Sequence, residues 1–326
     1  MWLTRGLPAW LLLPLALLFA LAVALRRQAY RRGWARVARL SVPVVVVGNI
    51  TAGGSGKTPL VLHLAQELAR LGWQPGIVSR GYGGSFTGVE PVTPDSDPRR
   101  IGDEPLLLAR RAGCPVFVGR DRVAAARALL EAHPECKLLI ADDGLQHLRL
   151  ARDIEIVVMD ERGLGNGWPL PAGPLREPAA RIAEADALVL NGEAVPPPVR
   201  PKKKFRMRLA GERFHLLRDP RQACDAAQLR GKRLHAVAGI GDPSRFFRQL
   251  ESLGLEFAAH AFPDHHDFRP AELAFADADA LLMTEKDAVK CQAIAPPETW
   301  VLPVAAQLDG EFTRWIVEKL DGRPPA

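Results

Sequence analysis

The segment TAGGSGKT, at residues 51–58, constrains the possible folds of this chain most. Residues 42–47 before it form a β-branched apolar run that is typical of a strand buried on both faces, and residues 59–71 after it have helical periodicity. This order of strand, loop and helix predicts a phosphate-binding loop, in which backbone N–H groups surround phosphate oxygens. A glycine-rich turn that only joins a strand to a helix is the structural alternative. The loop would comprise Thr51, Ala52, Gly53, Gly54, Ser55, Gly56, Lys57 and Thr58.

Three positions of this loop carry most of the expected chemistry. Lys57 is expected to reach the β- and γ-phosphates of a nucleotide, and Thr58 to bind magnesium. Thr51 departs from the pattern, because such loops usually begin with glycine. Gly53 and Gly54 supply flexibility nearby, so we expect the loop to form.

Strands and helices alternate after the loop. The segments PGIVS, PVFVG, KLLIADDG, IEIVVMD and DALVLNG have strand character, and EPLLLARRAG and RVAAARALLEAH have helical character. This order predicts an α/β fold with a doubly wound, mainly parallel sheet, whose ligands bind at the carboxyl ends of the strands. With 326 residues, 48% of them hydrophobic, the chain is long enough for two such units.

A proline-rich, charged stretch, VPPPVRPKKK at residues 195–204, interrupts this alternation and is typical of a linker. A second series of strands and helices starts near residue 233. We therefore expect an apolar helix with a basic flank at 1–39, a P-loop domain at 40–194, a linker with a possible β-ribbon at 195–230, and a smaller α/β domain at 231–326. Within this smaller domain, TEKDAVK at 284–290 lacks the asparagine of a guanine-reading loop, so it is either structural or a contact to the nucleotide.

The N-terminal part of the chain is expected to associate with a membrane. Residues 7–25 contain no charge, and their length is close to the roughly 20 residues that cross a hydrocarbon core. A cluster of arginines follows, which favours anionic lipid headgroups over nucleic acid and holds the following domain on the cytoplasmic side. A cleaved signal peptide is the alternative, but the apolar run is long for that role. No nucleic-acid-binding module is recognisable.

Two adjacent acids end one of the predicted strands. P-loop proteins place an acidic residue at the end of a neighbouring buried strand, where it holds magnesium directly or through water. Asp142 and Asp143 in KLLIADDG fit this role, although a turn at the end of a strand also favours aspartate. Gln146 and His147 follow in the same loop and are weaker candidates for orienting the metal or the phosphates.

Asp103 and His265 each have a structural and a functional interpretation. Asp103 precedes a predicted helix, where aspartate is a common cap. His265 and His266 lie in FPDHHDF, which could be a metal site, a solvated turn or a catalytic loop. The four cysteines have no paired spacing, so neither a zinc site nor a disulfide framework is indicated. Four arginines in glycine-rich loops suit phosphate, either on ATP or on an anionic lipid: Arg80, Arg120, Arg122 and Arg176.

Eight segments, taken in order, resemble the tetraacyldisaccharide 4'-kinase family of lipid A biosynthesis. They are GNITAGGSGKTP, SRGYGG, GDEPLLLA, ADDGLQH, PAGPLREP, AGIGDPSRFF, FPDHHDF and LLMTEKDAVK. The resemblance extends over almost the whole chain, including the N-terminal apolar helix. Apart from the P-loop each segment is a weak signal, but their ordered combination is specific.

The resemblance implies transfer of the γ-phosphate of ATP to the 4'-hydroxyl of a tetraacylated glucosamine disaccharide 1-phosphate, which gives lipid IVA. Residue by residue, it assigns nucleotide binding to residues 51–58, with Lys57 acting in catalysis. It assigns Mg²⁺ to Thr58 with Asp142 and Asp143, and general-base chemistry to Asp103 supported by His265. It places the enzyme at the inner membrane with its catalytic domains on the cytoplasmic face, and no obligate protein partner is indicated.

Two other classes of P-loop protein remain as alternatives. A membrane-attached nucleotide switch would prefer GTP, and the missing Asn-Lys-x-Asp loop counts against it. A transport ATPase would need more than one membrane span, and no signature loop of such ATPases is present.

Overall fold

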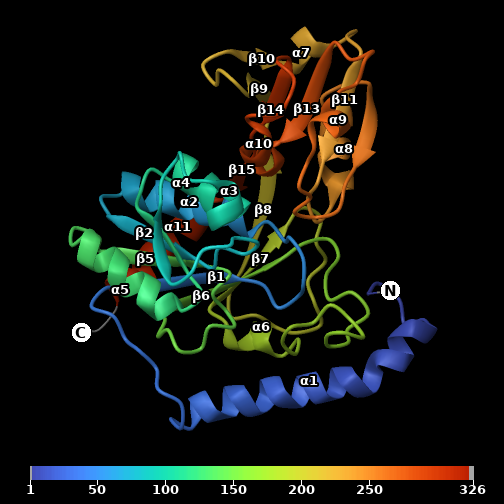
Figure 1. Ribbon diagram of the computed structural model, residues 1–326. Coiled ribbons are helices and arrows are strands. Elements are labelled where there is room, and N and C mark those ends of the chain that lie inside the picture. Colours follow the sequence, from blue (N-terminus) through green and yellow to red (C-terminus); the bar gives the residue numbers. More distant parts are fainter. Residues whose placement is uncertain (1, 323–326) are drawn as a thin grey trace.

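The chain builds two sheets, a nine-stranded one and a six-stranded one, in the computed structural model, which describes residues 2–322 (Figure 1). Met1 and residues 323–326, which end the predicted 231–326 domain, lie outside the described residues. The larger sheet has the order β15-β8-β7-β6-β1-β5-β2-β4-β3, and all its pairs are parallel except β15 with β8 and β3 with β4. Its strands are β1 (Val44–Gly48), β2 (Pro75–Ser79), β3 (Val89–Val92), β4 (Val116–Gly119), β5 (Leu138–Asp142), β6 (Ile154–Met159), β7 (Ala187–Asn191), β8 (Lys204–Ala210) and β15 (Ala305–Leu308).

Helices cover both faces of the larger sheet. Side chains of β1 alternate between two cores: Val45 and Val47 face one, and Val44 and Val46 face the other, which is why this strand is apolar without interruption. The first core is closed by α2 (Lys57–Arg70), α3 (Pro98–Ile101), α4 (Asp103–Arg111) and α11 (Gly310–Asp321), and the second by α5 (Arg122–Ala132) and α6 (Arg181–Glu184).

The six-stranded sheet is the centre of a second, smaller α/β domain. Its order is β10-β9-β14-β13-β11-β12, with a parallel part from β14 to β12 and antiparallel β9 and β10. Two cores flank it, one under α8 and one under α10, so both faces are covered. These arrangements confirm the predicted doubly wound fold with a smaller second domain. Its elements are β9 (Arg213–Leu216), β10 (Ala223–Asp225), α7 (Ala226–Leu229), β11 (Leu234–Ala238), α8 (Pro243–Ser252), β12 (Phe257–Ala261), α9 (Pro270–Leu273), β13 (Ala280–Thr284), α10 (Glu285–Cys291) and β14 (Thr299–Leu302).

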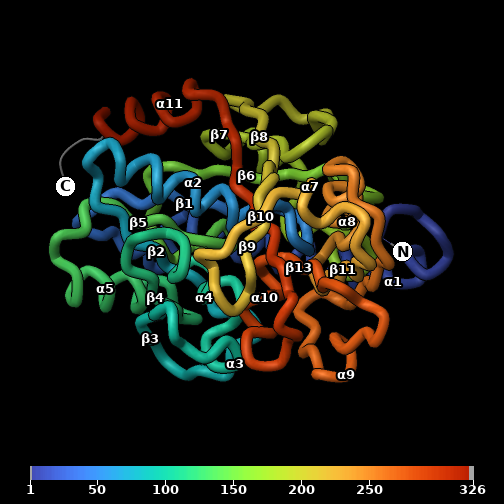
Figure 2. The backbone as a smooth tube through the Cα atoms, turned by 90° about the horizontal axis from the view of Figure 1, so that it is seen from above, coloured from blue at the N-terminus to red at the C-terminus, as the bar shows by residue number. Residues whose placement is uncertain are grey.

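The end of the chain differs from the predicted domain boundaries. β15 pairs with β8, and α11 packs beside α2 on the larger sheet, which Figure 2 shows in red beside blue α2. Phe312 of α11 is fully buried in the same core as Val45, so burial of this apolar face explains the return. Residues 305–321 therefore belong with the first domain, and the strand β8 from the predicted linker does too.

The N-terminal helix α1 (Leu7–Arg31) is long and apolar enough to cross a membrane. Figure 1 shows it lying lengthwise along one side of the larger domain. Contacts fix it at both ends: Trp10 packs edge-on against Trp168, and Arg27 forms an ion pair with Glu177 at 3.6 Å. Its outward residues stay exposed, with Leu11 73% exposed.

Candidate active site

The P-loop has the backbone shape that its glycines allow. Gly56 precedes α2 with a φ of +93°, and a Cβ there would lie 2.4 Å from Asn191 Nδ2. Asn191, at the end of β7, donates instead to the carbonyl of Ser55 at 3.0 Å. Gly53 has a φ of +98° and lies against the guanidinium of Arg162. Bulkier residues at these two positions would therefore distort the loop.

Thr51 occupies the position where a glycine is usual, and its backbone explains why threonine is accepted. Thr51 forms a bridge with Leu175, and the Ala52 N–H donates to the carbonyl of Pro174 at 2.8 Å. Among residues 2–322, the non-glycine residues with positive φ are Asp143 and His265, so Thr51 needs no glycine-like conformation. The segment PAGPLREP therefore supports the start of the loop.

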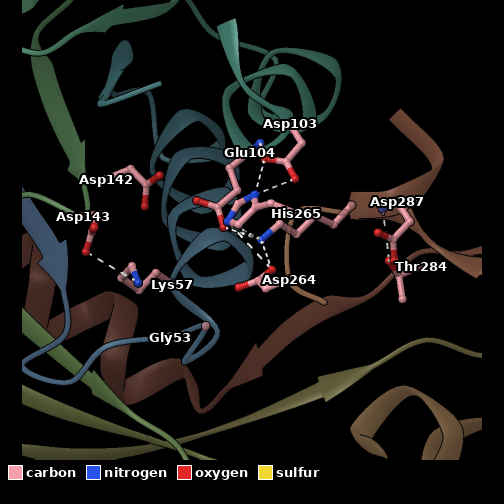
Figure 3. A network of polar contacts seen from close by, with 12 residues as sticks. Gly53, Lys57, Asp103, Glu104, Asp142, Asp143, Asp264, His265, Thr284 and Asp287 are labelled. Carbon is pink, nitrogen blue, oxygen red and sulfur yellow. Dashed lines mark hydrogen bonds and ion pairs between the residues drawn. The ribbon is translucent and has the colours of Figure 1, made fainter. Parts of the chain in front are cut away.

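The two strand-end acids have different surroundings (Figure 3). Asp143 lies 3.5 Å from Lys57 Nζ and 3.1 Å from Arg176 Nη1, and although burial opposes it, these cations hold the pKa of Asp143 below its usual value. Asp142 is 1% exposed, accepts from the Ser79 hydroxyl at 3.2 Å, and burial raises its pKa to about 7. Its Oδ1 is buried, and within residues 2–322 no group donates to it.

These residues fit a magnesium ion. The unpartnered, buried carboxylate oxygen of Asp142 is a hard oxygen donor of the kind that Mg²⁺ prefers, and this ion typically takes few protein ligands and keeps several waters. In the described part of the chain, no group of three or more His, Cys, Asp or Glu residues is arranged to hold a metal. Asp142 fits the ion better than Asp143, because Asp143 is already paired with two cations.

Asp103 and His265 are in contact, although they are far apart in the sequence. Asp103 is 5% exposed, and His265 Nδ1 lies 3.0 Å from its Oδ2 and 3.1 Å from its Oδ1. Gly102, not Asp103, occupies the N-cap position of α4, although the Asp103 carboxylate does accept from the N–H of Glu104 at 2.9 Å. The hydrogen bond to Asp103 raises the pKa of His265. Burial raises the pKa of Asp103, but His265, Lys286 and Lys290 outweigh it and leave that pKa lowered.

A lysine from the second domain joins this pair. Lys286 Nζ lies 2.9 Å from Glu104 and 3.1 Å from Asp264, and Figure 3 shows Glu104 between His265 and Asp142. The same helix, α10, forms a further ion pair with α4 through Glu285 and Arg111. Sequence reasoning did not find this contact, because nothing in TEKDAVK identifies its partner helix.

Two cavities adjoin the ion pair of Lys57 with Asp143: Lys57 lines the larger one and Asp143 the smaller one. The larger, about 820 Å³, lies between the two domains and is lined by Lys57, Thr58, Glu104 and Lys286 among others. The smaller, about 400 Å³, lies against α1, whose Phe19 and Val23 line it. All four arginines predicted from glycine-rich loops line the smaller cavity, together with two from α1: Arg80, Arg120, Arg122, Arg176, Arg26 and Arg27.

One further group at the P-loop was missed in the sequence. Arg162 donates to both oxygens of buried Asp160 and to the carbonyl of Gly54. Arg245 of α8 also reaches Asp160, at 3.4 Å, and links the second domain to the loop. The available signal was the tripeptide Asp160-Glu161-Arg162 directly after a predicted strand, but such charged tripeptides are too common at strand ends to indicate a function.

Comparisons with known proteins agree with this geometry. A family model described as Tetraacyldisaccharide-1-P 4'-kinase matches residues 8–321. A protein of Azoarcus sp. (strain BH72) named tetraacyldisaccharide 4'-kinase is 54% identical over 327 residues, covering 100% of this chain and 96% of that protein.

The chain belongs to the tetraacyldisaccharide 4'-kinase family.

Other relatives of this kinase family support the assignment. A protein of the same name from Dechloromonas aromatica (strain RCB) is 55% identical, covering 99% of this chain and 96% of its own length. The crystal structure of LpxK from Aquifex aeolicus in complex with ATP superposes with a TM-score of 0.83 at 29% identity, covering 96% of this chain and 100% of that one. The resemblance predicted from the sequence and the enzyme class, a kinase, are thereby confirmed.

Proposed function

We propose that this kinase transfers the γ-phosphate of ATP to the 4'-hydroxyl of a tetraacylated glucosamine disaccharide 1-phosphate, giving lipid IVA. The names of its relatives supply the substrate class. An ATP complex of a similar structure supplies the nucleotide. We assign nucleotide binding to residues 51–58 and magnesium to Thr58 with Asp142 and Asp143.

One contact carries the proposal: the ion pair of Lys57 with Asp143. Lys57 lines the larger cavity and Asp143 the smaller one, and their side chains lie 3.5 Å apart. A nucleotide on the P-loop and an acceptor among the arginines would therefore meet at this pair. Six arginines in the smaller cavity suit an anionic phosphate on the acceptor, because guanidinium groups bind phosphate oxygens in pairs.

The chemistry assigned to the residues is positioning and charge stabilisation, since phosphoryl transfer needs little covalent work from the protein. Lys57 stabilises negative charge on the transferred phosphate, and on binding it exchanges Asp143 for a phosphate oxygen. Asp103 accepts the hydroxyl proton, and His265 orients it through the Nδ1 contact. Magnesium, when bound, neutralises charge on the β- and γ-phosphates.

We further propose that α1 lies in the plane of the cytoplasmic surface of the inner membrane. The helix is held lengthwise by Trp168 and Glu177, so a spanning orientation would carry the charged smaller cavity into hydrocarbon, at a cost of several kcal/mol or more. Lying flat, its exposed leucines enter the lipid while its arginines meet headgroups. An acceptor held in the membrane would then enter the smaller cavity beside the helix.

The reaction is tested by incubating the full chain with [γ-³²P]ATP and synthetic tetraacyldisaccharide 1-phosphate in mixed micelles. We expect a labelled product whose mass is that of lipid IVA. Mild acid, which removes the 1-phosphate, should leave the label on the lipid, because the label is at the 4'-position. ATP hydrolysis that does not depend on the lipid, with no labelled lipid formed, contradicts the proposal.

The orientation of α1 is tested by placing single cysteines at Leu11 and Leu18, which face outward. With a lipid-depth fluorescence quencher, both positions should report a similar, shallow depth. Depths that differ by about 10 Å, as the rise of roughly 1.5 Å per residue gives for a helix along the membrane normal, contradict a helix lying flat.

A further inference from the structure

The segment TEKDAVK holds Lys286 in a fixed position. Thr284 ends β13, and its hydroxyl donates to buried Asp287 at 2.6 Å, while Asp287 also accepts from the N–H of Gly239 at 2.9 Å. These bonds tie the first turn of α10 to the end of β11. The direction in which Lys286 leaves the helix is therefore set by the hydrogen bonds of the buried Asp287 carboxylate.

Lys286 joins both domains at the far side of the His265 ring. Its Nζ lies 2.9 Å from Glu104 of the first domain, and 3.1 Å from Asp264 and 3.4 Å from His265 Nε2 of the second. Because His265 Nδ1 faces Asp103, the two ring nitrogens meet groups of opposite charge. An ammonium has only donors, so it can bond to Nε2 only when that nitrogen carries no proton.

We propose that Lys286 is a positioning residue for the Asp103–His265 pair. It holds the His265 ring through Nε2 and disfavours a proton on that nitrogen. The proposal rests on the proposed function in one respect, the role of Asp103 as the base. A proton on Nε2 would make His265 a cation and would strengthen its hydrogen bond to Asp103. Asp103 would then be a weaker base for the acceptor hydroxyl. Lys286 opposes this, so that Asp103 stays both ionised and available.

Several charged or titratable groups face His265, and their effects on its pKa differ in sign. The hydrogen bond to Asp103 raises the pKa of His265 and Asp264 adds to the rise, whereas burial and the charge of Lys286 lower it. The net direction is upward, so Lys286 limits the rise rather than reversing it. The groups in contact with the His265 ring are Asp103 of α4, Asp264 of the same loop, Lys286 of α10 and the ring of Tyr82. Glu104 contacts Lys286, and Lys290 lies 3.9 Å from Asp103.

The direct test is the pH titration of His265 in the full chain, free of nucleotide, followed by ¹⁵N chemical shifts of labelled histidine. The signal is assigned by its loss in His265→Gln. In Lys286→Met we expect the midpoint to rise by at least about 0.5 pH unit, because a like charge is removed. Lys286→Arg restores the charge and should restore the midpoint. An unchanged midpoint in Lys286→Met overturns the proposal.

Arg111→Gln is the matched control, because Arg111 forms the other ion pair between α4 and α10 and does not contact His265. It should leave the midpoint unchanged. Melting temperatures show whether each variant is folded. If Lys286→Met does not fold, Lys286→Gln gives the same test, since it keeps an N–H donor and removes the charge.

Kinetics add a second readout. We expect Lys286→Met to lower kcat roughly 10- to 100-fold, the range typical of residues that orient a functional side chain. The acid limb of its pH profile should move upward together with the histidine midpoint. Equal losses of kcat in Lys286→Met and Arg111→Gln would show that the lysine only joins the domains, and would overturn the proposal. Because the titration needs no turnover, failure of the proposed reaction is detected separately, by the absence of lipid product from the unsubstituted enzyme.

Discussion

Asp142 and Asp103 are both almost fully buried carboxyl groups, yet their surroundings shift their pKa values in opposite directions. Asp142 meets a serine hydroxyl and has one unpartnered oxygen, and burial raises its pKa to about 7. Asp103 is also desolvated, but a histidine and two lysines keep its pKa lowered. Burial alone therefore does not decide the charge of an active-site acid. The balance of nearby charges does: the carboxylates of Glu104 and Asp143 raise the pKa of Asp142 against the cations Lys57 and Arg122, whereas the charged groups that act on Asp103 all lower its pKa.

The two acids also differ in where their partners come from. The neighbours of Asp142 and Asp143 lie at the ends of adjacent strands and loops of one sheet. The partners of Asp103 come from the second domain, and His265 is 162 residues away in the sequence. The first arrangement suits an ion that arrives with the nucleotide. The second is complete before any ligand binds.

The largest expected effect concerns the strand-end side of this comparison. Lys57→Ala removes the cation that pairs with Asp143 and is assigned to the phosphates. We expect kcat to fall by more than about 10³-fold, since a preorganised charge on the transferred phosphate is lost. The melting temperature should change little. Steady-state assay of lipid product and thermal unfolding of the same preparation measure both.

Lys137→Ala is the control for this variant, because Lys137 is exposed and lies just before β5, at the opposite end of that strand from Asp142. Activity near that of the unsubstituted enzyme in a folded Lys57→Ala protein would remove the P-loop assignment.

The next effect concerns the interdomain side. Asp103→Asn and His265→Ala should each lower kcat by roughly 10²–10⁴-fold, the range for a general base. If the two residues act as a unit, the double variant should be little worse than the poorer single one. Nucleotide affinity should barely change. Asn keeps the acceptor that receives the Glu104 N–H but cannot take a proton, so retained turnover in Asp103→Asn would eliminate the base role.

The smallest effect is on stability, and its sign should differ between the two acids. The folded pKa of Asp142 is raised, so the stability that it contributes is present at low pH and is lost as pH rises from about 4 through about 7. The folded pKa of Asp103 is lowered, so its contribution is present above the unfolded pKa and is lost as pH falls through the folded one. In metal-free buffer at pH 8, Asp142→Asn should therefore stabilise the protein. Asp103→Asn should destabilise it.

Unfolding by urea from pH 4 to pH 8 measures this difference. The advantage of Asp142→Asn should shrink as the pH falls, because the unsubstituted acid becomes neutral. Parallel curves for the two variants would mean that the surroundings of the two acids do not differ as described.

The P-loop and the two strand-end acids were predicted from the residues alone, because the sequence patterns that mark them are local. The apolar run before TAGGSGKT and the acids that end KLLIADDG each mark a strand whose carboxyl end is known, and parallel strands bring such ends together. The pair of Asp103 and His265 was reached only through family resemblance. Hydrophobic periodicity cannot indicate that the start of a helix in one domain contacts a loop of the other domain.

Contacts that depend on side-chain direction were not predictable in the same way. Arg162 reaches the P-loop from a turn after β6, and Lys286 reaches Glu104 across the domain interface. The return of α11 to the first sheet was also missed, because its apolar stripe fits either core equally well by sequence. In each case the packing of distant segments, rather than local preference, fixes the position.

The place of β15 and α11 has a consequence for biosynthesis. A chain leaves the ribosome from its N-terminus and domains generally form as units during synthesis. Here the first sheet has its P-loop by residue 58, but one edge strand and the helix that carries buried Phe312 and Trp315 come only at residues 305–321. The smaller domain can thus finish folding while the larger one still exposes an apolar face. A nascent chain in this state is the form most in need of a chaperone, and early termination would leave a kinase fold that cannot close its own core.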